Sequence, residues 1–167
     1  MTEKMGYEKD KSFRRDYGVK SFRAKVGGII YSFDSDGEYY VAVWLEYLRR
    51  KGRIRTWNRE GMLYEFLEST HPKKYLPDFI VVEKDGTLVA VEYKTLLTLD
   101  HQAVKKLKRM ALHYPSVKID LVLDRITLGK GINKRASAAK YVRNVLDFSQ
   151  IRRETKGEVK YIKPVKL

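Results

Sequence analysis

The stretch that decides the fold reads Tyr75-Leu-Pro-Asp-Phe-Ile-Val-Val-Glu-Lys-Asp-Gly-Thr-Leu-Val-Ala-Val-Glu-Tyr-Lys94. Two apolar runs, 79–82 and 88–91, flank the pair Asp85-Gly86, and Asp-Gly between such runs is a strong signal for a β-hairpin. Because both runs are apolar at consecutive positions, they predict central strands that are covered on both faces.

The loop between these runs decides where the carboxylate of Asp78 points. A two-residue loop would pair Asp78 with Tyr93 and send the carboxylate to the face opposite Glu92. A three-residue loop, with Gly86 left-handed as a bulge, sets Asp78 directly opposite Glu92. We favour the three-residue loop, because it gathers two carboxylates and the Lys94 ammonium at one end of a buried hairpin.

Such a group of polar side chains is suited to metal-assisted chemistry. Two neighbouring carboxylates repel each other unless a hard cation lies between them, and Mg²⁺ accepts one or two carboxylates while keeping positions for water and phosphate oxygens. A lysine beside the ion can stabilise the negative charge of phosphoryl transfer or orient a water. The alternative is an ordinary ion pair at the hairpin end, such as Glu92 with Lys94. We favour the site, because this combination on adjoining strands is more specific than either half alone.

The arrangement Pro77-Asp78 followed by Glu92-Tyr93-Lys94 resembles the signature of the PD-(D/E)XK nuclease superfamily. The likeness extends upstream to Tyr31–Glu38, which resembles the glutamate-bearing helix start of phage members, and it covers roughly residues 26–123. Within the superfamily the chain is most similar to the phage junction-resolving endonucleases of the endonuclease I type and to small phage nuclease-like proteins. Those relatives usually have glycine after the motif lysine, where this chain has Thr95.

The resemblance implies a single α/β domain with a restriction-endonuclease-like core, which has a mixed central sheet and flanking helices. It implies Mg²⁺-dependent (or Mn²⁺-dependent) hydrolysis of DNA phosphodiesters, on branched or junction DNA, that leaves 5′-phosphate and 3′-hydroxyl ends. The implied catalytic residues are Glu38, Asp78, Glu92 and Lys94, and the implied metal ligands are the three carboxylates and the Tyr93 carbonyl. A resolvase makes two cuts, so we expect a homodimer that acts in the cytoplasm, in that of the host if the protein is phage-encoded.

Glu38 has two roles to choose between. Ser35-Asp-Gly-Glu38 is a capping box, which predicts a helix that runs to about Lys51 and stops at Gly52. Glu38 lies on the apolar stripe of this helix (Val41, Ala42, Leu45 and Leu48), one turn before it. A capping carboxylate does not need to lie on the apolar side of its helix, so we expect Glu38 to bind a metal ion as well as to cap the helix. Glu46 lies on another face and is expected to be solvated.

The remaining chain predicts further elements around the hairpin. Residues 53–58 are expected to form a strand, and 62–67 a second strand or the bent continuation of the first. Asp100 caps a helix to about His113, and 117–123 follows as a strand parallel to the one that carries Glu92. A last helix is expected near 134–148, and Tyr161–Pro164 as an edge strand or tail.

Composition limits the class of protein. The 167 residues, 43% of them hydrophobic, suit one domain with a substantial core. We assign 1–25 to a basic arm, 26–150 to the nuclease domain and 151–167 to a basic C-terminal tail or edge strand. The chain has no cysteine, which excludes disulfides and thiolate metal sites. We expect neither a signal peptide nor a membrane span, and a cytoplasmic location.

The net charge of +14 points to a polyanionic partner, and DNA is the partner we expect. The basic residues expected to contact it are Lys73, Lys74, Lys105, Lys106, Lys108, Arg109, Arg152 and Arg153. The arm is either disordered or becomes ordered on nucleic acid or a second subunit. Aromatic residues offered for dimer contacts are Tyr7, Phe13, Tyr17, Phe22, Tyr39, Tyr40 and Trp44.

Two other functions fit the same sequence. One is a site-selective duplex endonuclease of the transposon-end or homing type, which the same fold would support. The other is a non-catalytic module that binds nucleic acid or a replication protein and keeps the nuclease fold. The presence of every motif carboxylate and of Lys94 favours an enzyme over the second of these.

Overall fold

A computed structural model describes residues 21–125, 132–155, 158–159 and 167, and it has a mixed α/β fold. The described elements are, in chain order, β1 (Phe22–Val26), β2 (Ile29–Phe33), α1 (Asp36–Arg50), β3 (Thr56–Arg59), β4 (Tyr64–Glu65), β5 (Lys74–Tyr75), β6 (Phe79–Val82), β7 (Leu88–Lys94), α2 (His101–His113), β8 (Lys118–Leu123), α3 (Ile132–Ala139), β9 (Asn144–Asp147) and α4 (Phe148–Glu154).

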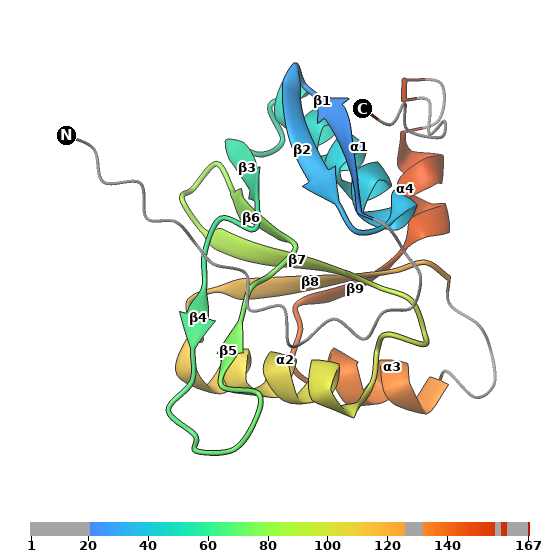
Figure 1. Cartoon of the computed structure of the whole chain (residues 1–167). Helices are drawn as coiled ribbons and strands as arrows, with labels where there is room; N and C mark the ends of the chain where they lie inside the picture. Colours follow the sequence, from blue (N-terminus) through green and yellow to red (C-terminus); the bar gives the residue numbers. More distant parts are fainter. Residues whose placement is uncertain (1–20, 126–131, 156–157, 160–166) are drawn as a thin grey trace.

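A five-stranded mixed sheet in the order β3-β6-β7-β8-β9 forms the centre of the fold. The pairs β3–β6 and β6–β7 are antiparallel, whereas the pairs β7–β8 and β8–β9 are parallel. Helix α1, the β1–β2 hairpin and α4 lie on one side of this sheet, and α2 and α3 lie on the other (Figure 1). The predicted α/β class and the parallel pairing of the strand after α2 are therefore confirmed.

The three-residue loop predicted between β6 and β7 is present. The Glu83 N–H donates to the Thr87 carbonyl at 2.9 Å, and the Gly86 N–H donates to the Glu83 carbonyl at 3.0 Å. Gly86 has a φ of 91°, the left-handed conformation that glycine adopts without steric cost. Phe79 lies opposite Val91, so the next residue outward, Asp78, stands opposite Glu92.

Both faces of the hairpin are buried, as the uninterrupted apolar runs predict. Val81 and Val89 pack in the core on the α1 side of the sheet. Ile80 and Ala90 point to the other side, where they join Met110 of α2 in a second core. The hairpin therefore lies between two apolar layers, and its polar end residues stand at the margin of both.

Helix α1 begins and ends where its capping signals predict. The Glu38 N–H donates to Ser35 Oγ at 3.1 Å, and Gly52, with a φ of 64°, follows the last turn. A side chain on Gly37 would put a Cβ only 2.1 Å from the Tyr93 ring. The glycine therefore lets the start of α1 lie directly against the end of β7.

Four side chains of α1 were expected on the surface or in an interface and are found in other surroundings. Glu46 was expected to be solvated, but it is only 7% exposed and accepts a hydrogen bond from Trp57 Nε1 at 3.1 Å. Trp44 is buried, and Tyr39 and Tyr40 pack against the same core. The elements around α1 therefore cover more of the helix than its single apolar stripe indicates: Trp44 belongs to the core, and Tyr39 and Tyr40 are half-buried against it.

The boundary of the N-terminal arm is also different. Residues 22–25, assigned to the arm, belong to β1, where Phe22, Ala24 and Val26 are buried at alternate positions. Phe22 stacks near Phe33 with ring centroids 5.9 Å apart, so it serves the core and not an interface. The remaining arm aromatics, Tyr7, Phe13 and Tyr17, lie outside the described residues.

The prediction of one helix over 134–148 is wrong. Helix α3 ends at Ala139, β9 follows as the fifth strand of the sheet, and α4 starts at Phe148. Pairing of β9 with β8 decides this, because it buries Val145 on one face of the sheet and Leu146 on the other. Residues 151–154, assigned to the tail, lie in α4, and Tyr161–Pro164 fall outside the described residues.

The segment between α1 and β6 contains shorter strands than predicted. β3 starts at Thr56, three residues later than expected, and 62–67 contributes only the two-residue β4, which pairs with β5. Within the described part of the chain, no helix combines the length and apolarity that crossing a membrane requires.

Candidate active site

Asp78 and Glu92 meet at the end of the β6–β7 hairpin, as the chosen loop predicts. The backbone N–H of Asp78 donates to Glu92 Oε2 at 3.2 Å, and the Tyr93 N–H donates to Asp78 Oδ2 at 2.8 Å. Each carboxylate is thus held by the backbone of the strand that carries the other. The two side chains form a fixed pair and do not turn away into solvent.

Lys94 belongs to the same group. Its ammonium lies 2.5 Å from Glu92 Oε1, and its side chain is 23% exposed, compared with 7% for the Glu92 side chain. The alternation of strand side chains places Lys94 two residues from Glu92 on the same face. The structure therefore contains the predicted grouping of Asp78, Glu92 and Lys94. It also contains the Glu92–Lys94 ion pair, which was the alternative to a metal site.

Tyr75 completes the surroundings of Glu92 and was not identified from the sequence. It is 2% exposed, and its hydroxyl donates to Glu92 Oε2 at 2.8 Å. The pairing of β5 with β4 places this ring beneath the hairpin end, in the core on the α2 side. Its position three residues before Asp78 was the only sequence signal, and a tyrosine there is equally compatible with simple packing.

The electrostatics of this group differ from those of a neutralised ion-pair network. Burial, together with the charge of Glu92 and to a lesser degree that of Glu38, raises the pKa of Asp78 well above its ordinary value. Burial alone would lower the pKa of the Lys94 ammonium, but the charges of Glu92 and Asp78 outweigh it and raise that pKa. Lys94 is therefore cationic at neutral pH, and its charge lowers the pKa of Asp78 by less than burial and the charge of Glu92 raise it.

Glu38 approaches this group from α1 but is bound to another residue. Its Oε2 lies 2.6 Å from Arg59 Nη2 and accepts a hydrogen bond from the Asp34 N–H at 3.0 Å. The carboxylate thus reaches back one residue beyond the helix cap. Burial raises the pKa of Glu38, although the Arg59 charge opposes that shift. Glu38 is near enough to raise the pKa of Asp78 as well, so it belongs to the same electrostatic neighbourhood.

Arg59 is the second residue that sequence reasoning missed. Its side chain is 6% exposed, and its guanidinium lies over the rings of Phe33 and Phe79 at 5.2 and 5.6 Å. It also donates to the Asp78 carbonyl at 3.4 Å. As the last residue of β3 it sits beside β6, a position that only the sheet pairing reveals. A single arginine therefore connects Glu38 to the strand that carries Asp78.

The oxygen donors of this site suit a hard divalent cation. In the described part of the chain Asp78 Oδ1 accepts no hydrogen bond, and the Tyr93 carbonyl points to the same side of β7 as the Tyr93 N–H, toward Asp78. No group of three or more His, Cys, Asp or Glu side chains among the described residues is arranged to hold a metal ion. Asp78 and Glu92 are thus adjacent, whereas Glu38 is turned to Arg59.

The loop after Lys94 follows a path specified by threonine. The Thr95 N–H donates to Thr98 Oγ1 at 2.9 Å, and the Leu99 N–H donates back to the Thr95 carbonyl at 3.0 Å. This turn leads into α2, whose N-cap Asp100 accepts from the Ala103 N–H at 2.8 Å. Thr95 therefore closes a compact hydrogen-bonded turn directly after Lys94.

The basic residues expected to contact DNA fall into two groups. Arg109 is 6% exposed and donates to Thr70 Oγ1 at 3.0 Å and to the Thr70 carbonyl at 2.8 Å. It fastens the loop before β5 and is not available to a ligand, so its assignment to DNA contact is corrected. The other seven are exposed or half-buried: Lys73, Lys74, Lys105, Lys106, Lys108, Arg152 and Arg153.

Comparison of the sequence with protein-family models gave no match, and comparison with curated proteins gave no match either. The class of protein that the described residues define is a mixed α/β domain with a hydrogen-bonded carboxylate pair and a lysine at the end of its central hairpin.

Proposed function

We propose that this protein is a Mg²⁺-dependent DNA endonuclease with a restriction-endonuclease-like core, acting on branched DNA. The observation that carries the proposal is the pairing of Asp78 with Glu92 on adjoining strands, with Lys94 beside them. Buried groups with perturbed pKa values that face one another are typical of functional sites. The motif resemblance supplies the reaction, and the net charge of +14 supplies the reason for a polyanionic substrate.

Asp78 and Glu92 are the residues that would hold a magnesium ion. Glu92 is paired with Lys94, whereas Asp78 forms no ion pair among the described residues and its pKa is raised by burial and by the charge of Glu92. Hard oxygen donors such as these carboxylates are the ligands that Mg²⁺ prefers. Bound there, Mg²⁺ would supply Lewis acidity toward the scissile phosphate and lower the pKa of a water. Two protein carboxylates suffice for this ion, which normally keeps several water ligands.

The protonation state of Lys94 restricts its role. Because the neighbouring carboxylates raise its pKa, the ammonium keeps its proton at neutral pH and cannot act as a general base. It would instead stabilise the extra negative charge of the phosphoryl transition state or orient the attacking water. Tyr75 and the Asp78 N–H hold Glu92 from the side opposite Lys94, which keeps the carboxylate in one orientation.

A second candidate is a non-catalytic DNA-binding module with the same fold. The ion pairs of Glu38 with Arg59 and of Glu92 with Lys94 favour it, because they satisfy two of the three motif carboxylates without a metal. Asp78 argues for the enzyme instead, since no cation among the described residues forms an ion pair with it. The two candidates differ in one measurable property, which is strand cleavage.

The deciding experiment is a cleavage assay on a four-way junction, a flap and a linear duplex that share one sequence. We expect nicks in Mg²⁺ or Mn²⁺, none in EDTA, and the highest rate on the junction. The variant Asp78→Asn should not cleave. Asp85→Asn is its matched control, since Asp85 is an exposed carboxylate at the opposite end of the same hairpin. Sequence-dependent cutting of the linear duplex would favour the site-selective alternative, and binding without cleavage in any metal would favour the non-catalytic module.

Resolving a junction takes two cuts in opposing strands, so we extend the proposal to a homodimer with two sites. Light scattering with and without junction DNA measures this directly. A monomer that nicks only one strand would contradict the resolvase proposal while leaving the endonuclease proposal in place.

A further inference from the structure

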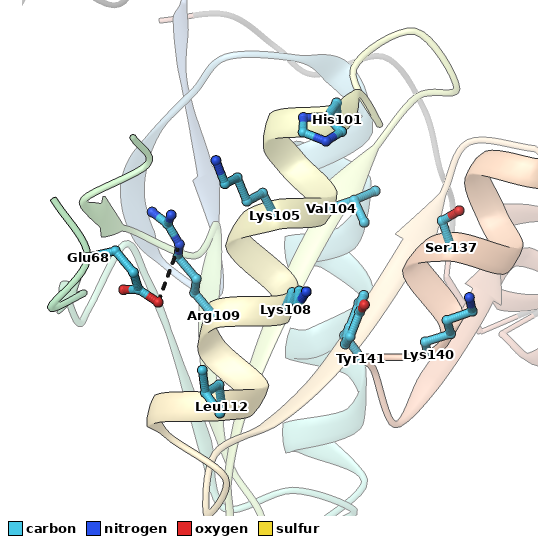
Figure 2. A pocket seen from close by; sticks show the side chains of 10 residues that line it. All are labelled: Glu68, His101, Val104, Lys105, Lys108, Arg109, Leu112, Ser137, Lys140 and Tyr141. Carbon is cyan, nitrogen blue, oxygen red and sulfur yellow. Dashed lines mark ion pairs between the residues drawn. The ribbon is translucent and has the colours of Figure 1, made fainter. Parts of the chain in front are cut away.

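A groove crosses the outer surface of α2, on the side of the molecule away from α1, with a volume of about 470 Å³. Figure 2 shows it between Glu68 on one side of α2 and the residues of α3 on the other. We call it the α2–α3 groove, and it is lined by ten residues, of which Lys105, Lys108, Lys140 and Tyr141 carry the argument. None of the motif residues Asp78, Glu92 and Lys94 lines it.

The spacing of residues along the two helices builds this groove. His101, Lys105, Lys108 and Leu112 are separated by four, three and four positions, so they form one stripe along α2. Tyr141 faces that stripe from just beyond the end of α3, and Lys140 lines the groove on the far side of Tyr141 (Figure 2). The groove therefore collects cationic side chains from segments that are far apart in the sequence.

The positive charge of the groove is not neutralised by the protein. Among the described residues, Lys105, Lys108 and Lys140 form no ion pair. The single carboxylate of the lining, Glu68, is already engaged by His113 at 2.9 Å and by Arg109 at 3.6 Å. Three ammonium groups that repel one another add nothing to the stability of the fold, which points to an external anion.

The position of the groove relates it to the candidate active site. His101 lies at one end of the groove and is the first residue of α2, joined to Lys94 by the short turn at Thr95. Lys134 of α3 donates to the carbonyl of Leu96 in that same turn at 3.1 Å, which ties the other wall to it. A chain of phosphates leaving the active site past this turn would therefore enter the groove.

We propose that the α2–α3 groove binds the phosphodiester backbone of DNA outside the cleavage position. This inference rests on the proposed endonuclease function and adds the surface that holds the substrate arm. A backbone fits better than a small anion, because the lysines are distributed along the helix and do not converge on one point.

The test compares two triple variants of equal charge change. Lys105→Gln/Lys108→Gln/Lys140→Gln alters the groove, and Lys25→Gln/Lys84→Gln/Lys118→Gln alters three exposed lysines outside it. Fluorescence anisotropy with a labelled junction in EDTA gives the Kd without cleavage. We expect the groove variant to bind about tenfold more weakly at moderate salt, with the slope of log K against log salt reduced by about two to three. The control variant should lose less than about a third of that.

Because a triple variant could misfold, lysine footprinting of the wild-type protein provides a second test that needs no substitution. Lysines are acetylated with and without the junction and read out by mass spectrometry. Protection of Lys105, Lys108 and Lys140, with continued modification of Lys25, Lys84 and Lys118, supports the proposal. Equal protection of both sets, equal affinity of both variants, or protection by polyglutamate and not by DNA overturns it. If any of these three results is found and the wild-type protein still cleaves DNA, the proposal for the groove fails while the endonuclease proposal stands.

Discussion

Glu46 is a buried carboxylate, and the Asp78–Glu92 pair joins a half-buried carboxylate to a buried one in the same domain, but the surroundings of Glu46 and of this pair are opposite. Glu46 accepts four hydrogen bonds, from Arg49 at 2.8 and 2.9 Å, from Arg50 at 3.1 Å and from Trp57 at 3.1 Å. The hydrogen bonds from Arg49 are the main cause that lowers its pKa to about 2. At the hairpin end, burial and like charge instead raise the pKa of Asp78.

Glu46 in its ionised form stabilises the fold, whereas ionised Asp78 lowers the stability of the fold. Glu46 is surrounded by donors and cations, so its ionised form is the favoured one. A Cβ on Gly27 would come within 2.7 Å of its Oε1, which shows how closely the chain packs around it. Asp78 and Glu92 have only the ammonium of Lys94 beside them, and a carboxyl group with a pKa raised in this way is typical of functional sites.

The largest expected effect is the loss of cleavage when a carboxylate of the hairpin-end site is replaced. Asp78→Asn and Glu92→Gln keep the shape of each side chain and remove its charge. We expect cleavage to fall by well over about a hundredfold, since even outer-shell partners of metal ligands contribute 10–100-fold. Binding of junction DNA in EDTA should persist, because the basic surface is unchanged. Wild-type cleavage by either variant would remove the site from the mechanism.

The same change from acid to amide should have opposite effects on stability in the two regions. Glu46→Gln loses hydrogen bonds to charged groups, which contribute about 1.5–3 kcal/mol each at most. We therefore expect a loss of about 2 kcal/mol, or roughly 4–8 °C in Tm. Asp78→Asn should raise Tm at pH 7 in EDTA, since it removes like-charge repulsion. Thermal unfolding of both variants beside wild type gives the two signs, and equal signs would contradict the contrast.

The pH dependence of these two differences follows from the pKa shifts. The folded-state pKa of Glu46 is depressed, so its contribution is present above the ordinary value of 4.5 and is lost as pH falls toward about 2. The pKa of Asp78 is raised above 3.8, so its cost is present at high pH and is relieved as pH falls through the raised value. Asp78→Asn should therefore approach wild-type stability from above as pH falls to about 3.8, whereas Glu46→Gln should approach it from below only near pH 2.

Tyr75→Phe tests whether the orientation of Glu92 matters. It removes one hydroxyl and leaves the ring in place, so packing is retained and Glu92 Oε2 keeps only the Asp78 N–H. We expect about a tenfold loss of cleavage and about 1 kcal/mol of stability. The Mg²⁺ titration of cleavage distinguishes a positioning role from a structural one, because only a positioning role shifts the midpoint. Tyr64→Phe is the matched control, as its buried hydroxyl has no hydrogen-bond partner within the described residues.

The smallest expected effect concerns Glu38, which lies between the two kinds of carboxylate. Glu38→Gln keeps an acceptor for the Asp34 N–H and removes the charge that Arg59 pairs with. We expect a few-fold higher Mg²⁺ requirement for cleavage and a small change in Tm, because glutamine serves the same capping geometry. An unchanged Mg²⁺ midpoint would assign Glu38 to the cap and the Arg59 ion pair alone.

Local sequence determined the hairpin, because loop chemistry and strand period are properties of neighbouring residues. The pair Asp85-Gly86 is compatible with two registers, and the three-residue loop was chosen because it gathers Asp78, Glu92 and Lys94, which is the register that the structure has. The caps at Ser35 and Asp100 are equally local, so the starts of α1 and α2 were predicted to the residue.

Only the tertiary structure decided how distant segments complete these elements. The 141–147 segment has residues compatible with a helix or a strand, and pairing with β8 chose the strand. Glu46 looked solvated because helical periodicity gives the position of a side chain on its own helix but not what covers it. The contacts of Arg59 with Glu38 and of Tyr75 with Glu92 join residues 21 and 17 positions apart, and only the packing of α1 and of the β4–β5 pair against the central sheet brings them together.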